Sequence, residues 1–128
     1  MAHTPHDIGV AKHIGRYSDA VEAAPGLRWL YSAGTPGMTK TGEVPADIES
    51  QSRLAWENVL ELLHDAGMTT ADLVKVTTSL IDAGDIPAYA RVRTAMLGDV
   101  RPAFMLQIVS QLVRPEIRVE IEVIAAAR

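Results

Sequence analysis

The longest regular pattern in the sequence is helical, and it limits the folds that are open to the chain. Across residues 47–66, apolar residues recur at spacings of three, four and seven: Ile48, Ala55, Val59, Leu62 and Ala66. Asp47 is placed to cap the first turn, and Gly67 to end the helix in a left-handed conformation. Because a helix with one apolar stripe is stable only against another layer, the other segments must supply that layer.

Segments with β-branched residues and alternating polarity predict the sheet that forms this second layer. Extended segments are expected at 16–21, 27–33, 74–81, 103–109 and 118–125. In the last segment alternate residues face opposite sides: Val119, Ile121 and Val123 on one, and Glu120, Glu122 and Ile124 on the other. This alternation predicts a strand with one buried face.

A second, shorter helix is predicted between Asp85, which would cap it, and Gly98. Pro87 is tolerated because it lies in the first turn, and the inner stripe is Tyr89, Val92 and Met96. Two helices on one face of a mixed sheet give an α+β two-layer sandwich in one domain, residues 1–128. The other sheet face is left without a cover although it is not fully polar, which favours a homo-oligomer.

Charge and residue content exclude several classes of protein. The chain has no cysteine, which excludes a disulfide framework, a thiolate zinc site and a cysteine nucleophile. Its net charge is −4, so a nucleic-acid partner is not expected. The sequence has no apolar run of about 18 residues and no secretory signal at its start, so we expect a cytoplasmic protein without a membrane partner.

Residues 1–13 carry three of the four histidines and are expected to be loosely ordered. Nothing in the sequence fixes the geometry of His3, His6 and His13, so we expect no metal site. The glycines of residues 34–42 lack the spacing of a phosphate-binding loop. No cofactor is therefore expected.

Glu120 and Glu122 are the most unusual local feature, because both point to one face of an otherwise apolar strand. One interpretation is a solvated face or pairing with a cross-strand arginine. The other is a carboxylate held at a subunit interface, where partial desolvation would suit it to proton transfer. Five arginines in the C-terminal half would allow an anion site if they converged: Arg91, Arg93, Arg101, Arg114 and Arg118.

Several motifs, none of them specific alone, together resemble those of one family. They are IGRYSDAV at 14–21, LYSAG at 30–34, TGEVPADI at 41–48, QSRLAWENVLELLHDAG at 51–67, LVKVTT at 73–78 and RVEIEVIA at 118–125. In this combination the chain resembles the RidA (YjgF) family, also known as the L-PSP endoribonuclease family. The resemblance implies a chorismate-mutase-like α+β fold, a homotrimer with clefts between subunits, and cofactor-free hydrolysis of reactive enamines and imines.

The resemblance also assigns roles to single residues. Tyr17 matches a tyrosine that lines the family's cleft, Gly34 a turn glycine, and Glu120 a glutamate that orients the attacking water. Phe104 stands where the family has an arginine that binds the substrate carboxylate, and an aromatic ring cannot make those charge-assisted hydrogen bonds. Ala33 replaces a turn serine, and the second helix departs from the family at Ala90 and Arg93.

These matches and departures lead to a specific hypothesis. We expect an enamine or imine deaminase for a small metabolite other than 2-aminoacrylate or 2-iminobutanoate. Glu120 and Tyr17 are its candidate catalytic residues, and its candidate substrate-binding residues are Ala33, Gly34, Arg93, Arg101 and Phe104. The alternatives are a small-molecule-binding protein without turnover and, with least support from the net charge, a ribonuclease.

Overall fold

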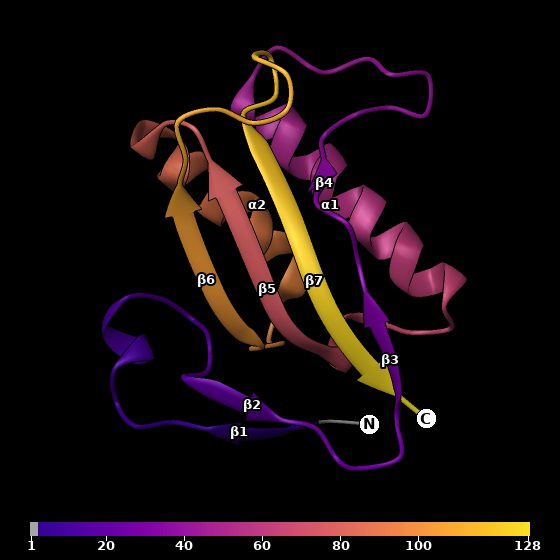
Figure 1. The fold of residues 1–128 in the computed structure, drawn as a ribbon. Coiled ribbons are helices and arrows are strands. Elements are labelled where there is room, and N and C mark those ends of the chain that lie inside the picture. Colours follow the sequence, from indigo (N-terminus) through magenta and orange to yellow (C-terminus); the bar gives the residue numbers. More distant parts are fainter. Residues whose placement is uncertain (1–2) are drawn as a thin grey trace.

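The structure is a computed structural model that describes residues 3–128, in which two α-helices pack on one face of a five-stranded sheet (Figure 1). The strands are β1 (Thr4–His6), β2 (Ala20–Glu22), β3 (Arg28–Tyr31), β4 (Thr35–Pro36), β5 (Leu73–Leu80), β6 (Ala103–Ile108) and β7 (Val119–Ala127). The helices are α1 (Ile48–Asp65) and α2 (Ile86–Leu97). No helix within residues 3–128 is long and apolar enough to cross a membrane.

The five-stranded sheet is mixed, which confirms the predicted fold class. Its order is β3-β7-β5-β6, and β4 also pairs with β7. Strands β5 and β6 are parallel and α2 forms the crossover between them, whereas β7 is antiparallel to each of its neighbours. Strand β7 therefore lies inside the sheet, where both of its edges are hydrogen-bonded.

Helix α1 begins and ends where the sequence predicts. The Asp47 carboxylate accepts a hydrogen bond from the Ser50 amide at 2.9 Å, and Gly67 has a φ of +71°. The predicted stripe is only partly correct, because Leu62 is 40% exposed whereas Trp56 and Leu63 are buried. The helix is rotated so that Trp56 enters the core.

Asp85 precedes α2 as predicted, but it does not cap the helix with its side chain. The buried Asp85 carboxylate instead accepts hydrogen bonds from Arg118 Nη2 at 2.7 and 2.9 Å and from Nε at 3.2 Å. A guanidinium fork donates several charge-assisted bonds to one carboxylate, whereas a capped amide donates only a neutral one. The contact fastens the start of α2 to the start of β7.

The alternation predicted for β7 is confirmed. Val119, Ile121 and Val123 are fully buried beneath the helices, and Glu120, Glu122 and Ile124 point to the other side. We call this other side the open face, because no helix of residues 3–128 covers it (Figure 1). It also carries Trp29 and Tyr31, which are 47% and 69% exposed and whose rings stack at 6.3 Å.

The N-terminal segment is more regular than the sequence predicts. Strand β1 pairs with β2 in an antiparallel hairpin, and residues 11–13 form a 3-10 helix. The Asp19 carboxylate accepts hydrogen bonds at 2.9 Å from the amides of Ile8 and Ala11 and thereby ties the connecting segment to the start of β2. The local sequence pattern does not predict these contacts, because the residues that make them are far apart in sequence.

Candidate functional site

Glu120 lies on the open face with its half-buried carboxylate against the backbone of Gly34. A Cβ atom added at Gly34 would overlap the Glu120 carboxylate, so a larger residue there would displace it. Across residues 3–128, no hydrogen-bond donor or cation of the chain pairs with that carboxylate. Its oxygens therefore remain available to water or to a ligand.

The turn beside Glu120 is held in place by Ser32, a residue that the sequence analysis did not single out. The Ser32 amide donates to the Val123 carbonyl at 3.0 Å, and the Ser32 hydroxyl accepts from the Val123 amide at 2.9 Å. The same hydroxyl donates to the Ala33 carbonyl, as does the Thr35 hydroxyl. Ala33 thus contributes a backbone acceptor, and the turn fixes Gly34 relative to β7.

The second group of candidate residues lies at the edge strand β6, on the helix side of the sheet. Phe104 pairs with the buried Val76 of β5 and packs against the core beneath α2. The ring of Tyr17 lies 6.3 Å from the ring of Phe104 at an angle of 54°. The guanidinium of Arg93 lies 4.6 Å from the centroid of the Phe104 ring. The structure therefore brings Tyr17, Phe104 and Arg93 together.

Backbone contacts determine where Tyr17 lies. The next residue, the buried Ser18, donates its amide to the Pro102 carbonyl at 3.2 Å and its hydroxyl to the Arg101 carbonyl at 2.7 Å. It also forms an isolated parallel bridge with Ala103. Residues 17–18 are therefore aligned with the first residues of β6, next to Phe104.

Tyr89 supports the group from inside the core. Its hydroxyl is hydrogen-bonded to the hydroxyl of Thr78, and its ring lies 5.8 Å from the Arg93 guanidinium. Burial raises the pKa of Tyr89 to about 12, so this phenol stays protonated and neutral at physiological pH. It is a fixed platform rather than a proton donor for chemistry near pH 7.

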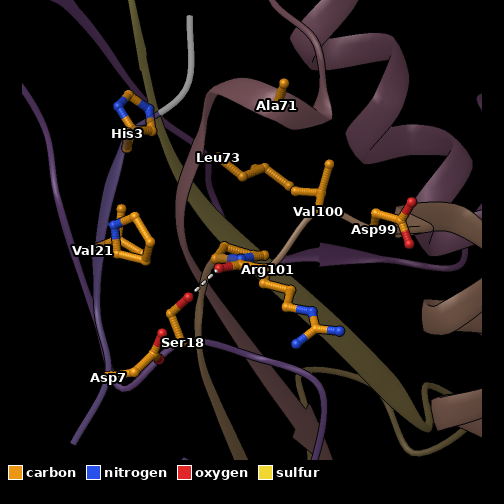
Figure 2. Close-up of a pocket in the computed structure, with 11 residues that line it drawn as sticks. His3, Asp7, Ser18, Val21, Ala71, Leu73, Asp99, Val100 and Arg101 are labelled. Carbon is orange, nitrogen blue, oxygen red and sulfur yellow. Dashed lines mark hydrogen bonds between the residues drawn. The ribbon is translucent and has the colours of Figure 1, made fainter.

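Arg101 lies near Tyr17 but contacts neither the Phe104 ring nor the Glu120 carboxylate within residues 3–128. Its side chain is exposed and lines a cavity of about 400 Å³ together with His3, Asp7 and Asp99. Figure 2 shows these lining residues. Arg101 also lines a cavity of about 210 Å³ together with Lys12 and Tyr17. Its guanidinium makes no ring contact with Phe104 among the contacts described for residues 3–128. Of the two arginines considered from sequence, Arg93 is the one that contacts Phe104.

The remaining arginines of the C-terminal half do not converge on one anion site. Arg118 pairs with Asp85, and Arg114 pairs with Glu116 two residues away. The N-terminal histidines are also separate: His6 pairs with Glu22 at 2.8 Å, and His3 is hydrogen-bonded to the Asp72 carbonyl at 2.9 Å. Nowhere in residues 3–128 do three or more potential metal-ligating side chains cluster.

The two groups lie on opposite faces of the sheet. Glu120 points away from the helices, because its strand neighbours Val119 and Ile121 are in the core. Phe104 points toward the helices together with Val76. A single chain therefore does not place Glu120 in one cleft with Tyr17 and Phe104.

Comparison with known proteins accounts for nearly the whole chain. The family described as Endoribonuclease L-PSP matches residues 9–127. A RutC family protein of Pyrococcus horikoshii is 38% identical over 116 residues, which cover 89% of each chain. The 2-iminobutanoate/2-iminopropanoate deaminase of Escherichia coli is 31% identical over 117 residues, which cover 90% of each.

A solved structure extends the comparison from sequence to fold. A protein of the conserved Rid protein family from Yersinia pestis superposes with a TM-score of 0.87 at 27% identity, covering 99% of this chain and 100% of that one. Sequence and fold thus agree over the same residues that carry Tyr17, Gly34 and Glu120. The chain belongs to the L-PSP endoribonuclease family, the family of the RutC and Rid proteins.

Proposed function

We propose that the protein hydrolyses a reactive enamine or imine to a carbonyl compound and ammonia, in clefts between the subunits of a homotrimer. The observation that carries this proposal is the half-buried Glu120 carboxylate, which lies against Gly34 with no partner from residues 3–128 of its own chain. A relative that is 31% identical is a deaminase of this chemical type.

In the proposed reaction Glu120 activates water. Its carboxylate takes a proton from the water as the water oxygen bonds to the imine carbon and the imine nitrogen is protonated. The protonated Glu120 returns its proton to the nitrogen of the resulting carbinolamine, ammonia leaves, and the hydroxyl proton passes to solvent as the carbon becomes a carbonyl. An enamine first gains a proton at carbon to become the imine. One water is consumed and one ammonia is released, so no cofactor is needed.

The separation of the two groups supports the proposed assembly. Glu120 lies on the open face and Tyr17 lies beside β6 on the helix side, so a cleft that contains both needs two chains. The open face also has exposed apolar side chains for a subunit contact: Trp29, Tyr31 and Met105. In such a cleft Tyr17 would hydrogen-bond the substrate while Glu120 of the neighbouring subunit activates water.

The proposed substrate differs from that of the E. coli relative. Phe104 offers no hydrogen-bond donor to a carboxylate at its position, and burying an unpaired carboxylate against an aromatic ring is strongly unfavourable. We therefore expect little hydrolysis of 2-aminoacrylate or 2-iminobutanoate. The same substitution favours a second candidate function, the binding of a small metabolite without turnover.

Glu120→Gln tests the proposed chemistry. Imines are generated in situ by an amine oxidase from a panel of amines and ω-amino acids, and release of the carbonyl compound is followed. We expect Glu120→Gln to lower turnover by about 100-fold or more, as for loss of a general base, while the melting temperature changes little. Glu57→Gln, an exposed glutamate of α1, is the matched control. Equal turnover by Glu120→Gln and wild type would contradict the mechanism, and wild type without turnover that still binds ligand would favour the second function.

Light scattering at micromolar concentration tests the assembly. We expect the mass of three chains. A monomer mass would contradict both the trimer and the location of the cleft.

A further inference from the structure

Arg93 is held in an unusual environment. It is half-buried on α2, with its guanidinium 4.6 Å from the Phe104 ring centroid and 5.8 Å from that of Tyr89. Two aromatic rings fix a guanidinium by cation–π attraction and restrict its rotation. Arg93 is therefore positioned by packing rather than by an ion pair.

The guanidinium of Arg93 has no acceptor within residues 3–128. Arg118 and Arg114, in contrast, donate to the carboxylates of Asp85 and Glu116. A guanidinium carries a planar fork of N–H donors that matches a carboxylate, and partial burial makes unpaired donors costly. Arg93 is thus a positioned cation whose hydrogen-bonding capacity is unused.

A small cavity lies beside this arginine. Its volume is about 130 Å³, and its lining includes Gly15, Arg16, Arg93 and Thr94. Arg16 also lines it but is partly neutralised by Asp99, 3.6 Å away. A Cβ atom at Gly15 would lie 3.4 Å from the Tyr17 ring and 3.9 Å from Arg93 Nη2, so this glycine leaves Tyr17 and Arg93 close together.

We propose that Arg93 is the anion-binding residue of this site and binds a carboxylate group of the ligand, with Phe104 and Tyr89 holding its guanidinium in place. In this proposal the Phe104 ring holds the Arg93 guanidinium in place, and Arg93 supplies the positive charge that Phe104 lacks. The positive charge comes from helix α2 and lies 4.6 Å from the centroid of the Phe104 ring, rather than extending from position 104 of strand β6.

This location defines a substrate class, and this step rests on the proposed deaminase function. The charge is displaced toward α2 relative to a side chain that starts at position 104. We expect a carboxylate bonded directly to the imine carbon to meet the Phe104 ring, and one separated from that carbon by a short chain to reach Arg93. The proposed substrates are imines with such a distal carboxylate.

Binding of benzoate, with benzamide as its neutral isostere, tests the anion site without relying on turnover. In calorimetry on the full chain we expect wild type to bind benzoate more tightly than benzamide. Arg93→Met should weaken benzoate binding by about ten-fold or more, and Arg93→Lys by less, because lysine keeps the charge but loses the fork. Arg91→Met, an exposed arginine on the same helix, is the matched control and should stay within about two-fold.

Three results would overturn the assignment: unchanged benzoate binding by Arg93→Met, the ten-fold loss appearing in Arg101→Met instead, or benzamide binding as tightly as benzoate. Each variant is first checked for the elution volume and melting temperature of wild type. If Arg93→Met unfolds, Arg93→Lys decides the matter, because it keeps the charge and the aliphatic packing.

Turnover separates this inference from the proposed function. With the imine of 4-aminobutanoate, whose one carboxylate is separated from the imine carbon by two methylene groups, Arg93→Met should raise KM and change kcat much less than Glu120→Gln does. If no imine is turned over but benzoate binding depends on Arg93, the deaminase function fails and the anion site stands. If turnover depends on Glu120 but not on Arg93, the function stands and this inference is overturned.

Discussion

Two groups of candidate residues differ in what determines their geometry: Glu120 with Gly34, and Arg93 with Phe104 and Tyr89. Glu120 is placed by strand alternation and by the missing side chain of Gly34, both of which are local properties of the backbone. Arg93 is placed by rings from α2 and β6, which meet only because β6 lies at the edge of the sheet beneath α2. The geometry around Glu120 therefore suits the retention of one catalytic step, the proposed activation of water. The geometry around Arg93 and Phe104 suits a change in the ligand that is bound.

The largest expected effect concerns the second group and a short substrate. Wild type should hydrolyse 2-iminobutanoate two to four orders of magnitude more slowly than an arginine-bearing relative, because two charge-assisted hydrogen bonds of about 1.5 to 3 kcal/mol each are missing. The measurement is keto-acid formation with imine generated in situ. Comparable rates would contradict the assignment of catalysis to Glu120 and of ligand selection to Phe104 and Arg93.

Phe104→Arg sharpens the same comparison. An arginine at 104 would lie next to Arg93, and like charges at that distance repel. The single variant should therefore gain less 2-iminobutanoate hydrolysis than Phe104→Arg combined with Arg93→Met. Equal gains in the two variants would mean that Arg93 does not lie close to the guanidinium of an arginine at 104. No gain in either variant would assign the low hydrolysis of 2-iminobutanoate to other departures from the family, such as Ala90.

The next largest effect concerns the ion pair that joins the two regions. Asp85→Asn should lower the free energy of unfolding by about 2 to 3 kcal/mol, less than for a fully buried pair, because the Arg118 side chain is 33% exposed. Urea denaturation measures this change. Asp82→Asn, which alters an exposed aspartate on the preceding turn, is the comparison variant. Equal, small losses would show that Asp85 and Arg118 do not fasten α2 to β7.

Glu120 and Glu122 share the open face but should differ in role. Glu122→Gln should weaken subunit association by about ten-fold, as for loss of a charge-assisted hydrogen bond in the core of the proposed trimer, while Glu120→Gln leaves it unchanged. Sedimentation across a dilution series measures both. The opposite pattern would exchange the two assignments.

The smallest expected effect lies in the N-terminal segment. Hydrogen bonds from the Ile8 and Ala11 amides hold the pKa of the Asp19 carboxyl below its usual value. A depressed folded-state pKa means that the stabilisation is present above the unfolded-state pKa of about 3.9 and is lost as pH falls through the lower, folded-state value. Amide exchange at Ile8 and Ala11 should therefore rise in acid, relative to core amides. Asp19→Asn should show the fast exchange already at pH 7.

Much of the fold was predictable because it depends on local patterns. The cap at Asp47, the end of α1 at Gly67 and the alternation of β7 all follow from residues within a few positions of one another. That alternation also placed Glu120 on the face away from the core. The exposed Leu62 was not predictable, because its helix turns to bury Trp56 against a sheet that periodicity cannot place.

The sequence by itself determined the two helices, the long strands β5, β6 and β7, and which face of β7 is buried. Only the tertiary structure decided that Asp85 pairs with Arg118, 33 residues away, and that Arg93 lies on the Phe104 ring. The reason is geometric. Periodicity fixes the direction of a side chain relative to its own backbone, but its partners depend on the sheet order β3-β7-β5-β6, which brings distant segments side by side.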